Sequence, residues 1–231
     1  MLYEKTVILK ETNVMIKANT KRAVANAESA LIRCRQELEN YIERDRTFLT
    51  SLAPVDVSPS APDIVKGMAE AAREMNVGPM ASVAGAIADA MLDAALSAGA
   101  TTAIVENGGD IAVYVGKGEG DIEVGIYAGN SPFSEKIGLR IRDGTGRMGV
   151  CTSSGTVGHS LSFGKADAVV VVADNATLAD AAATSIGNMV SEKEDITTAI
   201  ARAKKMRIHG VIIIIDNFMG VWGNLPQIVR V

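Results

Sequence analysis

The chain of 231 residues is long enough to bury a large core, and its 48% apolar and 22% charged residues are typical of a globular protein. A net charge of −4 and an aromatic content of 4% argue against a basic or base-stacking surface for nucleic acid. The start MLYEKTVILKE is unlike a signal peptide, the aliphatic run 211–215 is too short to cross a membrane, and two cysteines cannot form a disulfide framework. We therefore expect a cytoplasmic protein that binds neither nucleic acid nor membranes.

The first part of the chain predicts a β-hairpin followed by helices. Alternating apolar residues in KTVILK and VMIKA, on either side of ETN, predict two paired strands. From about Thr20 to Tyr41, apolar residues recur every three or four positions and predict one long helix with Cys34 on its buried face. The segment SLAPVDVSPSAP predicts a loop that forms a lid or a crossing. We assign residues 1–61 to this hairpin, long helix and proline-rich loop, within a single domain of residues 1–231.

Residues 62–231 are predicted to form the core that carries the candidate site. Helices are expected over PDIVKGMAEAAREM, over about 81–98, from near Thr177, and over EKEDITTAIARAKKM. Strands are expected at TTAIVE, IAVYVG, IEVGIYAG, KIGLRIRD, GVCT, ADAVVVVA, GVIIIID and QIVRV. Because the strands cluster without strict β-α-β alternation, we predict an α+β layered domain with a mixed, largely antiparallel sheet and packed helices.

Two glycine-rich segments are candidates for ligand binding. In ENGGD, Gly108 and Gly109 would let the backbone approach a ligand between the carboxylates of Glu106 and Asp110, although a tight turn explains the glycines equally well. The segment GTGRMG matches G-x-G-x-x-G, but strand-forming residues follow it instead of a helix. We therefore interpret it as a turn and not as a dinucleotide motif.

The segment GVCTSSGTVGHSLSFGKADA, residues 149–168, is rich in hydroxyl side chains and glycine. Cys151 stands at a strand end, where a cysteine is more often buried than nucleophilic. His159 follows in the loop and is either a general base, a phosphate contact or a solvated histidine. Further along, Asp180 and Thr184 lie one helical turn apart, a spacing that can hold Mg²⁺, although Thr177-x-x-Asp180 also resembles a capping box.

Taken in order, these segments resemble the flavin transferases of the ApbE type, which transfer FMN from FAD to a threonine of a target protein with Mg²⁺, and in particular a compact prokaryotic branch of that superfamily. The stretch VAGAIADAMLDAALSAGATTAIVENGGDIAV is similar to that family's helix, strand and GGD unit. CTSSGT is similar to its TSG loop, His159 stands near its H-x-x-D-P histidine, and LADAAATS is similar to its metal helix. The matching residues of the first unit are Gly85, Asp89, Gly108, Gly109 and Asp110.

The resemblance implies an α+β fold, Mg²⁺ and either FAD or FMN as cofactors, and a small anionic or phosphorylated ligand. It implies Mg²⁺ ligation by Asp180 and Thr184, and a catalytic role for His159. The candidate ligand-binding residues are those of the two loops, Gly108, Gly109, Asp110, Thr152, Ser153, Ser154 and Gly155. The chain departs from the family pattern where Ala84 replaces a lysine and where SLSFGKAD replaces D-P-x-T-G.

Three functions remain open on the sequence. The first is a magnesium-dependent enzyme similar to flavin or nucleotidyl transferases. The second is a sulfur- or acyl-transfer enzyme that uses Cys151 as a thiolate beside His159, because a nearby imidazolium lowers a thiol pKa. The third is a non-catalytic ligand-binding module on the same fold, which the departures at Ala84 and SLSFGKAD favour. A homo-oligomer built from the strand-rich ends is also open.

Overall fold

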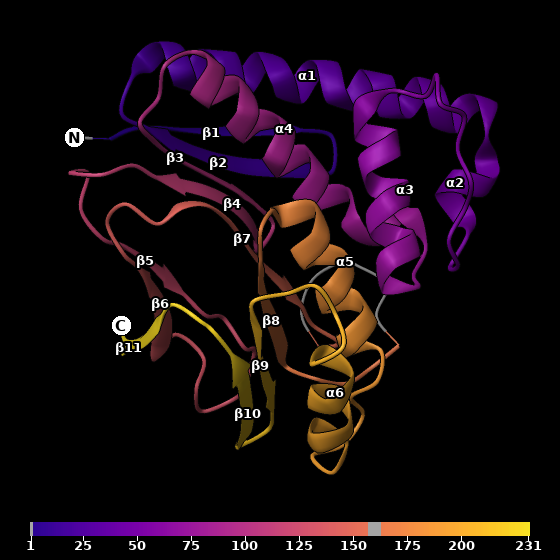
Figure 1. The fold of residues 1–231 in the computed structure, drawn as a ribbon, viewed down its shortest axis with the longest axis vertical. Coiled ribbons are helices and arrows are strands. Elements are labelled where there is room, and N and C mark those ends of the chain that lie inside the picture. The colour runs from indigo at the N-terminus through magenta and orange to yellow at the C-terminus, as the bar shows by residue number, and fades with distance from the viewer. Residues whose placement is uncertain (1, 157–162) are drawn as a thin grey trace.

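The computed structural model describes residues 2–156 and 163–231 (Figure 1). Its largest element is an eight-stranded sheet whose ladders, in the described residues, are all antiparallel. In spatial order the strands are β1 (Tyr3–Leu9), β2 (Thr12–Ala18), β3 (Thr102–Asn107), β4 (Asp110–Val115), β7 (Gly146–Ser153), β8 (Ala168–Ala173), β9 (Gly210–Ile215) and β10 (Phe218–Gly223). The strands of this sheet therefore lie in chain order; helices intervene after β2 and after β8, and one excursion of strands leaves the sheet between β4 and β7.

That excursion contributes two strands of a second, smaller sheet. Its order is β11 (Gln227–Arg230), β6 (Ile137–Ile141) and β5 (Ile122–Gly125), so the last strand of the chain joins the hairpin inserted between β4 and β7. Helices cover the opposite face of the large sheet (Figure 1). They are α1 (Lys21–Arg44), α2 (Arg46–Thr50), α3 (Asp63–Met75), the 3₁₀ turn η1 (Pro79–Ser82), α4 (Val83–Ser97), α5 (Ala176–Gly187) and α6 (Asp195–Ala203).

The alternation of side chains along the central strands separates two cores. Cys151 and Val171 pack with the helices, whereas their neighbours Val150 and Val170 pack toward the small sheet. Because both faces are covered, β8 and β9 are buried along their whole length. The α+β layered architecture predicted from the sequence is confirmed, with a sheet that is antiparallel throughout its described part.

The long helix forms as its apolar spacing predicts. Thr20 caps α1 by accepting a hydrogen bond from the N–H of Ala23 at 3.1 Å. The buried face contains Val24, Leu31 and Cys34, so Cys34 belongs to the core as expected. The stretch Pro79–Ser97 is long and apolar enough to cross a membrane, yet half of it is buried here, where α4 packs against α1, α5 and β3. The apolar character of this stretch therefore follows from its central place in the helical layer.

Three local features differ from the sequence-based expectation. Strand β10 was not predicted, and the short helix α2 precedes the proline-rich loop. The cap of α5 is Asn175, whose side chain accepts from the N–H of Leu178 at 2.8 Å, and not Thr177 with Asp180. The GTGRMG segment is a turn into β7, as interpreted, with positive φ at Gly144 and Gly146.

Candidate functional site

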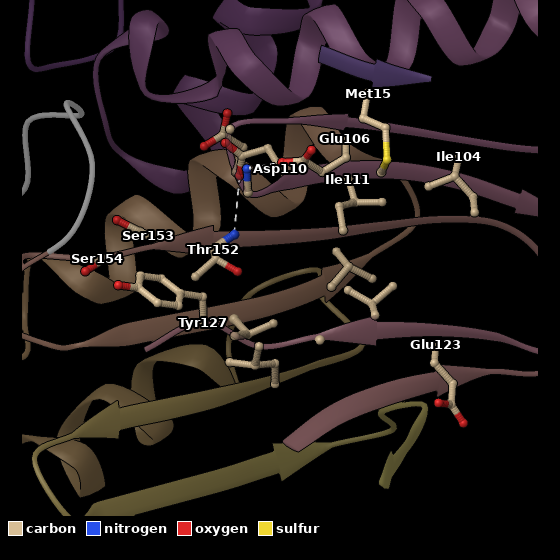
Figure 2. Close-up of a pocket in the computed structure, with 18 of the residues that line it drawn as sticks. Met15, Ile104, Glu106, Asp110, Ile111, Glu123, Tyr127, Thr152, Ser153 and Ser154 are labelled. Carbon is tan, nitrogen blue, oxygen red and sulfur yellow. Dashed lines mark hydrogen bonds between the residues drawn. The ribbon is translucent and has the colours of Figure 1, made fainter. Parts of the chain in front are cut away.

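A cavity of about 490 Å³ lies between the large sheet and β5 of the small sheet. Figure 2 shows its wall, with Glu106, Asp110 and Thr152 close together and with Ser153, Ser154 and Tyr127 grouped to one side. The polar lining residues are Lys17, Glu106, Gly108, Gly109, Asp110, Glu123, Tyr127, Thr152, Ser153, Ser154, Asp180 and Thr184. The cavity therefore collects polar residues from five segments of the chain.

The turn between β3 and β4 brings the diglycine to the cavity. Gly108 and Gly109 have φ of 64° and 99°, which L side chains rarely adopt, so the turn itself requires glycine here. A Cβ at either position would meet no atom within 4 Å, so the backbone faces open space. The N–H of Gly109 donates to Glu106 Oε1 at 2.8 Å, and Asp110 Oδ1 accepts from the N–H of Thr152 at 3.3 Å.

Helix α5 contributes Asp180 and Thr184 to the same cavity. Asp180 Oδ2 accepts from the N–H of Gly85 at 2.9 Å, at the start of α4. The Thr184 hydroxyl donates weakly to the carbonyl of Ala81 at 3.5 Å. The capping interpretation of Asp180 is wrong, because its carboxylate lies one turn inside α5 and contacts α4 instead of the first turn of its own helix.

The end of β7 contributes three hydroxyl side chains, those of Thr152, Ser153 and Ser154. Gly155 does not line the cavity; its N–H donates to the carbonyl of Ala166 at 2.9 Å, and a Cβ there would overlap the Gly164 backbone. Its glycine is thus explained by close packing of the loop. His159 lies outside the described residues, and its catalytic role stays a prediction.

Cys151 does not line the cavity, although it lies beside Asp110; it alternates along β7 with the lining residues Val150 and Thr152. Its side chain is fully buried in the helical core, and its thiol donates to the carbonyl of Ala176 at 3.3 Å. Burial, reinforced by the charge of Asp110, raises the pKa of the Cys151 thiol well above its ordinary value. An activated thiolate requires a lowered thiol pKa, whereas the pKa at this position is raised. The geometry therefore does not support the thiol alternative.

The cavity lining is rich in carboxylates. Glu106, Asp110, Glu123 and Asp180 line it together with one cation of the described lining, Lys17. Lys17 is paired with Glu4 at 3.1 Å, and Glu123 with Arg140 at 2.7 Å, so two of these charges are already balanced. Glu106, Asp110 and Asp180 form no ion pair with the cations that the structure describes.

Burial dominates the titration of the two innermost carboxylates. It raises the pKa of Asp110 to about 7, an effect that the nearby charge of Glu106 increases. It also raises the pKa of Asp180 well above its ordinary value, together with the charge of Asp110. A cation placed between these groups would relieve the desolvation and repulsion that disfavour their charged forms.

The oxygen donors of the cavity suit a Mg²⁺ ion that also binds waters and ligand phosphates. Within residues 2–156 and 163–231, no group of three or more His, Cys, Asp or Glu side chains could hold a metal by itself. Mg²⁺, however, commonly binds through one or two carboxylates and completes its shell with waters and ligand phosphates. Asp180 and Thr184, with Asp110 nearby, provide a donor set of that kind, and a phosphorylated ligand would complete it.

The apolar wall of the cavity was not identified from the sequence. It contains Met15 and Ile104 from the large sheet, Ile122 and Val124 from the small sheet, and the half-exposed ring of Tyr127 (Figure 2). Strand alternation places Met15 and Lys17 on one face of β2, and this could be predicted from the sequence. The sequence could not predict which face of the sheet β5 covers, because that depends on the pairing of distant segments.

This arrangement defines the class of the protein: its fold is that of the ApbE flavin transferases. The chain matches the flavin transferase ApbE from Vibrio cholerae with a TM-score of 0.59 and 14% identity, over 96% of this chain and 97% of that one. It matches the ApbE protein from Thermotoga maritima with a TM-score of 0.57 and 15% identity, over 100% and 97%.

Sequence relatives place the chain more narrowly. Residues 4–209 match the family model described as AbpE bacteria, and the chain belongs to that family. It is 43% identical over 236 residues to a UPF0280 protein from Methanocaldococcus jannaschii, covering 100% of this chain and 94% of that protein. It is 45% identical over 235 residues to a UPF0280 protein from Methanococcus aeolicus, covering 100% and 93%. The predicted relationship to an ApbE-like prokaryotic branch is confirmed.

Proposed function

We propose that the cavity binds a flavin nucleotide together with Mg²⁺, and that the protein is a magnesium-dependent flavin transferase-like enzyme. The observation that carries this proposal is the convergence of Asp110, Asp180, Thr184 and the hydroxyls that end β7 on one cavity. The GGD turn, the TSSG loop and α5 each contribute residues to its lining. The hydroxyls of Ser153 and Ser154 would contact the ligand's phosphate, whereas the N–H of Gly109 is already used by Glu106.

The two kinds of wall suit the two parts of a nucleotide. The apolar side chains of both sheets form a slot between β-sheet faces, which favours a flat ring system. The carboxylates favour a divalent cation over a bare phosphate, because with Lys17 already paired the described lining offers no unbalanced positive charge. Ala84 stands where the resembling family has a lysine, so its side chain cannot neutralise phosphate charge. Mg²⁺, when bound, would neutralise that charge.

The transfer itself would break the bond between the two phosphates of FAD. A hydroxyl oxygen of an acceptor protein would form the new bond to the FMN phosphorus, AMP would leave, and the hydroxyl proton would pass to a base. Asp110 is a candidate for that base by position, because its carboxylate lines the cavity and accepts from the N–H of Thr152, beside the hydroxyls that end β7. His159 is the second candidate, on the sequence resemblance alone.

Calorimetric titration with FAD, FMN and ATP, each with Mg²⁺ and with EDTA, tests the proposal. We expect a flavin nucleotide to bind with Mg²⁺, and Thr184→Val to weaken that binding roughly tenfold, equivalent to ~1.4 kcal/mol. Thr198→Val, on the exposed face of α6, is the matched control and should bind as the unmodified protein does.

Absence of heat and of thermal stabilisation for every nucleotide would overturn the proposal. Binding of FAD that is recovered intact after incubation with a hydroxyl-bearing acceptor would retain the binding site and reject the transfer. That second result would support the alternative of a non-catalytic ligand-binding module.

A further inference from the structure

Asp89 accepts several hydrogen bonds although it does not line the cavity. It belongs to α4, is 8% exposed, and lies on the helical side of the large sheet. Its carboxylate accepts from the N–H of Ala176 at 3.2 Å, from the N–H of Thr177 at 2.8 Å and from the Thr177 hydroxyl at 2.6 Å. These donors form the first turn of α5.

Arg147 on β7 fixes the same carboxylate from another side. Its Nη2 donates to Asp89 at 2.9 Å, and its Nη1 donates to Asp93 one turn further along α4. The buried Nε of Arg147 has no partner in the described part of the chain, so the two aspartates hold the guanidinium. The Asp89 carboxylate is therefore restrained both by a strand and by the helix that it caps.

This arrangement determines where α5 begins relative to α4. Asn175 caps the N–H of Leu178, while Asp89 takes the N–H groups of Ala176 and Thr177, which no residue of α5 itself can satisfy. One turn later Asp180 accepts from the N–H of Gly85, again on α4. A rotation or shift of α5 would move Asp180 and Thr184 together, because both project from this helix into the cavity.

We propose that Asp89, held by Arg147, is a positioning residue for the cation site, acting through the first turn of α5. The inference rests on the proposed function, in which Asp180 and Thr184 hold the metal. Removing the charge of Asp89 leaves one acceptor for three donors of α5 and unbalances Arg147. Residues that hydrogen-bond to metal ligands typically change metal affinity 10- to 100-fold, and Asp89 acts one step further away, through the helix that carries both ligands.

The test is titration of the full chain with Mn²⁺ alone, followed by electron paramagnetic resonance, which counts free and bound ion without any nucleotide. Asp89→Asn should raise the Mn²⁺ dissociation constant at least about tenfold while the number of sites per chain stays the same. Asp93→Asn is the matched control, because it removes the negative charge of the other carboxylate that pairs with Arg147. Among the described residues, Asp93 itself makes no hydrogen bond to α5. Its dissociation constant should stay within about twofold of the unmodified protein.

The affinity and the stoichiometry separate positioning from loss of structure. A variant that merely unfolds in part would bind fewer ions at unchanged affinity, and that result for Asp89→Asn would overturn the inference. Equal Mn²⁺ affinity in Asp89→Asn and the unmodified protein would also overturn it, while leaving the proposed function in place. Absence of Mn²⁺ binding by the unmodified protein would reject the metal site itself and with it this inference.

Discussion

Asp110 links the electrostatics of the cavity to the stability of the fold. Its pKa is raised to about 7 by burial, whereas an unfolded aspartate titrates near ~3.9. The folded state therefore binds the proton more tightly than the unfolded state does. The stabilisation from protonated Asp110 is complete below the unfolded pKa and is lost as the pH rises through about 7.

We predict that, with EDTA present, the free energy of unfolding decreases between about pH 5 and pH 8, by on the order of 2–4 kcal/mol from this group. Asp110→Asn should remove that part of the decrease, because an amide keeps an acceptor for the N–H of Thr152 without titrating. Urea unfolding at several pH values measures both. Glu123→Gln is the control, since Glu123 is partly exposed and paired with Arg140; an unchanged slope in Asp110→Asn would contradict the assignment.

At the scale of elements, the crossing of α4 and α5 depends on Gly85. A Cβ at this position would lie 2.6 Å from the carbonyl carbon of Ala176 and 2.9 Å from the Cβ of Asp180. Both distances are shorter than real contacts allow, and the first partner is backbone. The helices can therefore approach this closely only while residue 85 is glycine.

Gly85→Ala should separate the two helices and destabilise the protein by about 1–3 kcal/mol, lowering the melting temperature by roughly 5 °C. Gly67→Ala is the matched control in α3, where a Cβ would meet no atom within 4 Å. There, helix propensity should make the change neutral or stabilising, by up to ~1 kcal/mol. Thermal melts of both variants decide the matter, and equal melting temperatures would contradict the close packing.

The elements that the sequence predicted are those whose signal is local. The stripe of α1 and the alternation of the β1–β2 hairpin follow from neighbouring residues, and both formed as expected. Strand β10 escaped prediction because Gly220 interrupts its apolar pattern. The structure explains that glycine, since a side chain there would overlap Ile196 and Ile200 of α6.

The candidate site was predictable only in part, for a similar reason. The polar residues Asp110, Asp180 and Thr184 stood out by type and spacing, and they do line one cavity. Gly155 matched the same loop but serves packing, and Cys151 follows the alternation of β7 into the opposite core. The role of Asp89 was invisible, because it depends on where β7 and α5 lie relative to α4.

At the scale of the whole molecule, we predict that residues 1–231 unfold as a single domain. The first and tenth strands are opposite edges of one sheet, and helices from both halves of the chain pack on it. Trp222, the single tryptophan, lies on β10, whereas far-ultraviolet circular dichroism reports the helices. The two thermal transitions should coincide, and a separate earlier transition for either probe would contradict a single cooperative unit.

The pairing of β11 with β6 also bears on how the protein is made. The strand that completes the small sheet comes from residues 227–230, while its partner was translated long before, at residues 137–141. A ribosome must therefore have passed residue 230 before that sheet can be finished. It follows that the small sheet, whose strand β5 faces the cavity, is complete only after residues 1–230 have been synthesised.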